Sequence, residues 1–175
     1  NDGDNRGVSY FNTGENNSLV SKGIGNSYNQ ANVDNSALLA ERLFAFSDAI
    51  GGSNLKADID IGNNDGIIYQ GKTYGEDTDA FFKDAFQDII AAGTELDQTT
   101  KDMAASFEGS AEELLTFVMV MDSVDDVVKG LAGSFEGTSE EIIKYATAME
   151  GIYQATQSNP VHTALSDVID GLDSA

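Results

Sequence analysis

The chain has 175 residues, of which 41% are apolar, and this length is enough to bury the core of one domain. It carries 30 acidic residues against 9 basic ones, a net charge of −21, which argues against nucleic acid or an anionic membrane as a partner. The absence of cysteine excludes disulfides, thiolate nucleophiles and cysteine-based zinc sites. No apolar stretch has the length of a membrane span. Because the sequence begins at Asn1 without a methionine, we expect it to be a piece of a longer protein.

Residues 1–35 are rich in Asn, Gly and Ser, and their apolar residues follow no clear period. This composition predicts an extended or loop-rich lead, followed by a single globular α+β domain over residues 36–175. A helix is expected over 36–50, because Leu39, Leu43 and Phe46 recur at helical spacing and two glycines follow Ile50.

Residues 55–74 have a different period. Apolar and polar residues alternate up to Gly62, an Asn-Asn-Asp-Gly turn follows, and Ile67, Ile68 and Tyr69 begin a second strand. This pattern predicts a β-hairpin, and a further turn at Gly71 is followed by Thr73 and Tyr74. The fold class predicted from the sequence is therefore α+β, mainly helical, with one β-hairpin before a helical region.

The remaining residues show helical spacing of apolar side chains. The expected helices lie at 78–92, 97–105, 110–121, 123–131, 138–157 and 160–172. The last one has Pro160 in its first turn.

The helical region contains an internal duplication with an offset of 28 residues. Residues 106–115 read SFEGSAEELL, and residues 134–143 read SFEGTSEEII. In each copy a Ser or Thr stands three residues before a Glu, which is the sequence of a capping box at a helix start. The duplication predicts two helix–loop–helix units, with Phe107 and Phe135 buried against the long helix that follows each of them.

Two carboxylates in the hairpin are the first candidates for chemistry. Asp58 and Asp60 lie on the same face of one strand, where they are suited to acid–base work or to binding a hard cation. The favoured interpretation is that they form the solvent face of a half-buried strand. Asn63, Asn64 and Asp65 make the adjacent turn rich in oxygen atoms, but the spacing does not match an EF-hand.

The other candidates have simple structural interpretations. Asp122, Asp125 and Asp126 are placed to cap a helix start and compensate its dipole. His162 has no nucleophile or second histidine nearby, and the four methionines are expected to fill the core (Met103, Met119, Met121 and Met149). No known catalytic or nucleotide-binding motif is present, so we predict no catalytic residue, no cofactor and no metal ligand.

Three segments of the sequence, taken together, resemble one protein family. They are NRGVSYFNTG at 5–14, DGIIY and YGEDTDAF at 65–69 and 74–81 with FQDII at 86–90, and the repeated SFEG phrase. In this order they are similar to a late region of bacteriophage or prophage tail tape-measure proteins, over roughly residues 5–150.

The resemblance implies a non-enzymatic structural module of the virion that acts at the tail tip or during tail ejection. It also implies tail-tube or tail-tip proteins as partners, a possible homo-oligomer, and synthesis in the cytoplasm of a bacterial host. The sequence has no coiled-coil heptads, so we expect the part of such a protein that sets the length of the tail to lie outside these residues. Two alternatives stay open: a peptidoglycan hydrolase that uses Asp58, Asp60 or Glu76, and a secreted acidic module that binds cations.

Overall fold

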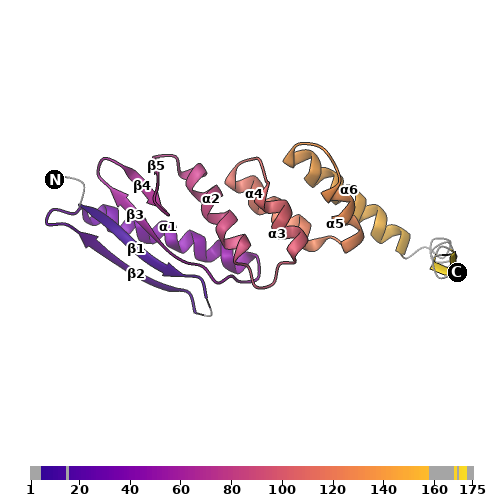
Figure 1. Ribbon diagram of the computed structural model, residues 1–175, viewed down its shortest axis with the longest axis horizontal. Coiled ribbons are helices and arrows are strands. Elements are labelled where there is room, and N and C mark those ends of the chain that lie inside the picture. Colours follow the sequence, from indigo (N-terminus) through magenta and orange to yellow (C-terminus); the bar gives the residue numbers. More distant parts are fainter. Residues whose placement is uncertain (1–4, 15, 158–167, 169, 173–175) are drawn as a thin grey trace.

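The computed structural model describes residues 5–14, 16–157, 168 and 170–172, and it shows the α+β, mainly helical fold predicted from the sequence (Figure 1). A sheet and the helix α1 form one end, and a stack of helices extends from it. The elements are β1 (Arg6–Asn12), β2 (Ser18–Ile24), α1 (Gln30–Ala49), β3 (Lys56–Gly62), β4 (Gly66–Tyr69), β5 (Lys72–Gly75), α2 (Thr78–Ala91), α3 (Gln98–Ala105), α4 (Ala111–Ser123), α5 (Asp126–Gly133) and α6 (Ser139–Gln157).

The five strands form one antiparallel sheet in the order β2-β1-β3-β4-β5. The predicted extended or loop-rich lead over residues 1–35 instead contains the paired strands β1 and β2, and α1 begins within it at Gln30. β1 pairs along its whole length with β2 on one side and with β3 on the other. The predicted hairpin is present as β3 and β4, and the further turn leads into β5 as expected.

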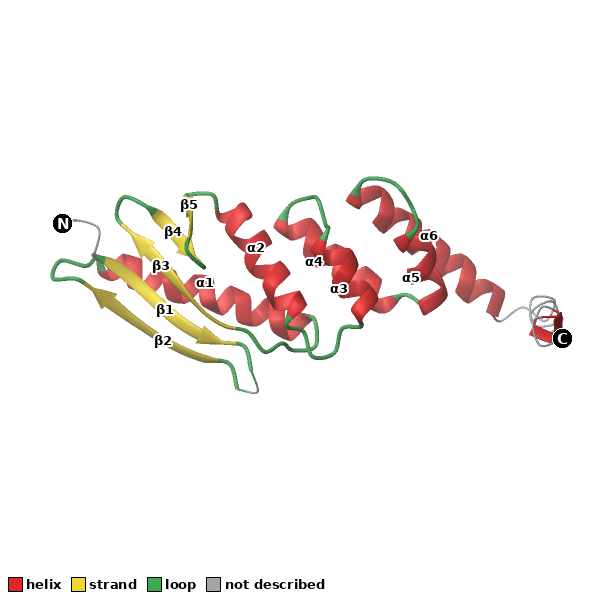
Figure 2. Ribbon diagram, viewed as in Figure 1, coloured by secondary structure: helices red, strands yellow, loops and turns green. Residues whose placement is uncertain are grey.

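Helix α1 covers one face of β1, β2 and β3 (Figure 2). It begins at Gln30, earlier than the predicted Ser36, because the side chain of Asn29 caps it by accepting a hydrogen bond from Ala31 N. The helix lies very close to the sheet at this end. A Cβ atom on Gly7 would sit 2.2 Å from Val33 N, and one on Gly23 would meet the Tyr28 ring at 2.2 Å. Gly7 is therefore required by the contact between α1 and the sheet, and Gly23 by the ring of Tyr28 in the loop before α1.

Helix α2 lies beside α1 and contacts β4 and β5. The rings of Phe46 and Phe86 stack between the two helices with their centroids 3.9 Å apart. The hydroxyls of Tyr69 and Tyr74 donate hydrogen bonds of 2.6 Å to Asp88 and Asp84 of α2. These contacts join the sheet to the helical part of the molecule through one continuous core.

The duplication is confirmed in the helix boundaries. The short helix α3 starts at Gln98 and α5 starts at Asp126, while the long helix α4 starts at Ala111 and α6 at Ser139. We call α3 with α4 the first repeat unit and α5 with α6 the second. The long helices α2, α4 and α6 stack side by side (Figure 2), and α6 runs on to Gln157, past the position at which α4 ends. The expected helix at 160–172 and His162 lie outside the described residues, apart from 168 and 170–172, which are helical.

Candidate functional site

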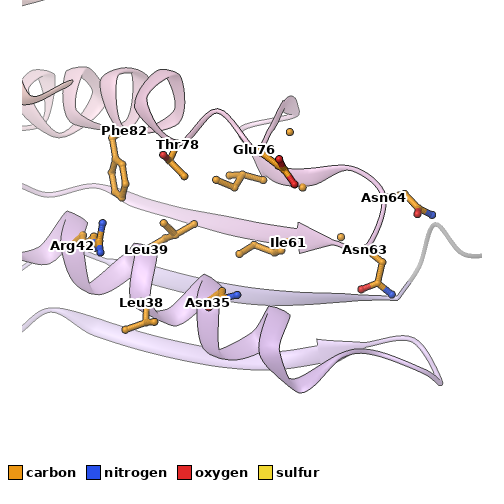
Figure 3. Close-up of a pocket in the computed structure, with 14 residues that line it drawn as sticks. Asn35, Leu38, Leu39, Arg42, Ile61, Asn63, Asn64, Glu76, Thr78 and Phe82 are labelled. Carbon is orange, nitrogen blue, oxygen red and sulfur yellow. The ribbon is translucent and has the colours of Figure 1, made fainter. Parts of the chain in front are cut away.

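A cavity of about 690 Å³ opens between α1, α2 and the turn from β3 to β4 (Figure 3), and we call it the α1–α2 pocket. Its volume lies in the range of ordinary ligand sites. One side is apolar and is built from Leu38, Leu39, Ile61, Ile67 and Phe82. The polar lining side chains are Asn35, Arg42, Asn63, Asn64, Glu76 and Thr78.

The two charged side chains of this pocket, Arg42 and Glu76, lie apart from each other. The guanidinium of Arg42 lies over the ring of Phe82, 5.9 Å from its centroid, at the α2 end. Glu76, Asn63 and Asn64 lie toward the β3–β4 turn. The carbonyl oxygen of Asn63 accepts a 2.7 Å hydrogen bond from Asn32 Nδ2, which leaves the Asn63 amide N–H groups free to donate. The pocket thus carries a cation at one end and a carboxylate at the other.

The predicted carboxylate pair lies on the opposite face of the sheet. Asp60 pairs with Val8 of β1, whereas the adjacent Ile59 is buried under α1, so Asp60 points away from the helix. The predicted solvent exposure is correct for Asp58 and wrong for Asp60, which is only 8% exposed. Arg6 covers Asp60, with Nη1 3.0 Å from Oδ2.

Burial raises the pKa of Asp60 to about 6, and hydrogen bonding to Asp58 acts in the same direction. The charge of Arg6 opposes both effects and lowers the pKa. Among the residues that the structure describes, the buried Asp60 Oδ1 and Arg6 Nε atoms have no hydrogen-bond partner. The sequence did not indicate Arg6, because its partner Asp60 lies on β3 and no pattern near either residue shows that β1 pairs with β3.

The three acids named for a hydrolase do not converge. Glu76 lines the α1–α2 pocket, while Asp58 and Asp60 lie on the far face of the sheet. Glycoside hydrolases need two carboxyl groups on either side of the substrate, separated by roughly 5–9.5 Å. Asp60 is only 8% exposed and is covered by Arg6, so its carboxyl group has no open approach for a substrate.

The oxygen-rich turn at 63–65 shows no metal site. Asn63 is engaged by Asn32, and the side chain of Asp65 is exposed. In the part of the chain that the structure describes, no group of three or more His, Asp or Glu side chains is arranged to hold a metal ion.

The remaining candidates have structural roles. Asp125 caps α5 by accepting a hydrogen bond from Val127 N, and Asp126 lies in the first turn of that helix, as predicted. The prediction is wrong for Asp122, which lies in the last turn of α4. The expectation of a buried core position is correct for Met121 and wrong for Met119, which is 47% exposed. Met103 and Met149 pack at the margin of the core.

The repeated phrase is used for capping and packing. The hydroxyls of Ser110 and Thr138 accept hydrogen bonds from the backbone N–H of the glutamates three residues later. Thr138 N donates in turn to Glu141 Oε2, which completes a reciprocal capping box. Each repeat-unit phenylalanine packs on the following long helix: Phe107 is buried against Phe117, and Phe135 is half-buried against Tyr145. The predicted burial is correct for Phe107 and only partial for Phe135, while Glu108 and Glu136 of the two loops are exposed.

Comparison with known proteins identifies no relative: no family model matches the chain, and neither a curated protein nor a solved structure is significantly similar to it. Among the described residues, no helix combines the length and the apolar character needed to cross a membrane.

Proposed function

We propose that this chain is a non-enzymatic structural module of a bacteriophage tail tape-measure protein and acts at the tail tip or during tail ejection. The phage context comes from the resemblance of the three sequence phrases to that family. The geometry supports the structural part of the proposal.

The observation that carries the proposal is the use of the repeated residues. Each copy of the SFEG phrase supplies a helix cap, a packed phenylalanine and a glycine in contact with that ring. All of these are structural contacts within a repeat unit, and the long helices α4 and α6 of the two units pack against each other. A chain that repeats its packing elements in this way is suited to form an elongated scaffold.

The direct test is to locate the protein in assembled particles. Antibodies raised against the purified chain are applied to tailed particles from the strain that encodes it, and bound gold is imaged by electron microscopy. We expect label at the tip of the tail and peptides of this chain in the mass spectrum of purified particles. Particles that lack these peptides would exclude the proposal.

One observation favours the hydrolase alternative, namely a carboxyl group on Asp60 that holds its proton to a pH of about 6. Incubation of the protein with purified peptidoglycan and measurement of solubilised fragments tests it. We expect no release above a buffer control. Release that is abolished by Asp60→Asn or Asp58→Asn, in variants with unchanged circular dichroism spectra, would replace the structural proposal by an enzymatic one.

A further inference from the structure

We propose that the α1–α2 pocket is a binding site for a ligand with an apolar body and a single carboxylate group. This goes beyond the structural role proposed above and does not depend on it. The pocket lies at the junction of three elements, so a ligand there contacts α1, α2 and the end of the β3–β4 hairpin at once.

The apolar body is indicated by the pocket wall. Leu38 is a large apolar residue with 55% of its surface exposed, although it lies on a helix whose opposite face is fully packed. Leu39, Ile61 and Phe82, which line the same cavity, are half-buried. An apolar ligand body removes these side chains from water.

The carboxylate is indicated by Arg42. Within the described ranges this guanidinium forms no ion pair, although acidic residues outnumber basic ones by 30 to 9 in the chain. Arg42 is an exposed residue that lines the pocket, and its guanidinium lies over the Phe82 ring. A guanidinium presents paired donors that match the two oxygens of a carboxylate, so an anionic head group is bound in preference to a neutral one.

Glu76 sets the orientation of the ligand. Its carboxylate lies between Thr78 and the β3–β4 turn, toward the end of the pocket opposite Arg42 (Figure 3). It therefore repels a ligand carboxylate from that end and directs it toward Arg42. A neutral Gln at position 76 removes this repulsion without changing the shape of the side chain.

Methyl NMR tests the site with octanoate as the probe. Addition of octanoate should shift the methyl signals of Leu38, Leu39, Ile61 and Ile67, with little effect on methyl groups of the repeat units. Arg42→Gln should weaken binding at least tenfold, and Arg42→Lys should weaken it less because the charge remains. Lys22→Gln is the matched control, since Lys22 lies on the edge strand β2 away from the pocket, and it should leave the affinity unchanged.

Two further probes test whether the ligand needs its negative charge and whether the natural ligand is a small acid or the end of a protein chain. The neutral analogue 1-octanol should bind more weakly than octanoate. A short peptide that ends in Leu-Leu with a free carboxylate, compared with its amidated form, tests whether a protein chain end is the natural source; tighter binding than octanoate assigns a chain end, and weaker binding assigns a small acid. Equal affinities for octanoate and octanol, or an affinity that Arg42→Gln does not reduce in a folded variant, would overturn the proposal.

Discussion

The ring of Phe107 lies so close to Gly109 that a Cβ atom on this glycine would sit 2.9 Å from the ring Cε1 atom. The second repeat unit has the same arrangement, with Phe135 Cε1 2.7 Å from the corresponding position of Gly137. The Glu141 carboxylate of the capping box approaches the same point at 2.6 Å. The glycine of the repeated phrase is therefore fixed by the phenylalanine before it and the glutamate after it.

Gly109→Ala and Gly137→Ala should each lower the free energy of unfolding by about 1–3 kcal/mol, because the new methyl group forces the ring or the loop to shift. Gly151→Ala is the matched control. Gly151 lies inside α6 with open space around its Cβ position, so alanine should be neutral or stabilise the helix by up to about 1 kcal/mol. Urea unfolding followed by circular dichroism measures all three. Equal effects in the loops and in α6 would contradict the steric account.

Phe107→Ala should destabilise the protein more than Phe135→Ala. Phe107 is 6% exposed, and its replacement should cost about 3–5 kcal/mol, the usual range for a buried aromatic residue. Phe135 is half-buried, so less of its contact surface is lost. The same unfolding experiment gives the order, and a larger loss at Phe135 would show that the second repeat unit carries more of the stability than its burial indicates.

The bond between Asp97 and Lys129 joins the two repeat units and should be sensitive to substitution. The Lys129 side chain is 6% exposed, and Asp97, which also caps α3 through Thr100 N, accepts its hydrogen bond. Asp97→Ala should cost more than the loss of a cap alone, which is about 1 kcal/mol, because it leaves a buried ammonium group without its partner.

The double variant with Lys129→Met should recover part of this loss. Partial burial acts to raise the pKa of Asp97, but hydrogen bonds from Lys129 and Thr100 outweigh it and lower the pKa. The stabilisation of the folded state by the ionised Asp97 is therefore complete at neutral pH, and it is lost as the pH falls through the lowered pKa of the folded state. Unfolding of the wild-type protein and the variants at neutral and at acid pH tests both statements, and a double variant no more stable than Asp97→Ala would argue against a buried charge as the cause.

Asp60 should make the protein less stable as the pH rises from about 4 to about 6. Burial raises its pKa from 3.8 to about 6, so the folded state holds the proton more tightly than the unfolded chain does. Below this interval both states are protonated, and above it the folded state bears the cost of a buried charge. Asp60→Asn should remove this step.

The difference in unfolding free energy between wild type and Asp60→Asn, measured across this pH range, isolates the contribution of Asp60 from the background of the other acids. Exposed Asp58 supplies the control: Asp58→Asn should reduce the step without abolishing it, since desolvation of Asp60 remains. A pH-independent difference for Asp60→Asn would mean that Asp60 is already ionised at pH 4.

The repeat units and the hairpin were predictable because their signals are local. A cap, a glycine and an apolar run lie within ten residues of each other in each repeat, and the β3–β4 turn lies between two alternating segments. The match of the 28-residue offset to the helix starts shows that these local signals also set the boundaries of the helices.

The strands of the lead were not predictable from such signals. Val8 and Phe11 of β1 lie on opposite faces of the sheet. Gly7 and Gly23 are typical of loops in a sequence, but here they are needed because α1 packs on Gly7 and Tyr28 packs on Gly23. The α1–α2 pocket was not predictable either, because it too depends on contacts between residues that are distant in the sequence. Arg42 and Phe82 are forty positions apart in the chain, and the spacing of residues within α1 or α2 does not indicate that they meet.

The position of β1 has a consequence for the order in which the molecule folds. β1 comes first in the chain, yet it is complete only after β3 has been made, because Arg6 pairs with Gly62 and Asn12 with Lys56. The helices of the repeat units contact near neighbours in sequence and pay a smaller loop-closure entropy, so they form sooner. We therefore expect the completion of the sheet to be the slow step of folding. A fragment that starts at Gln30 would keep its helices but expose the long edge of β3, and we expect it to aggregate.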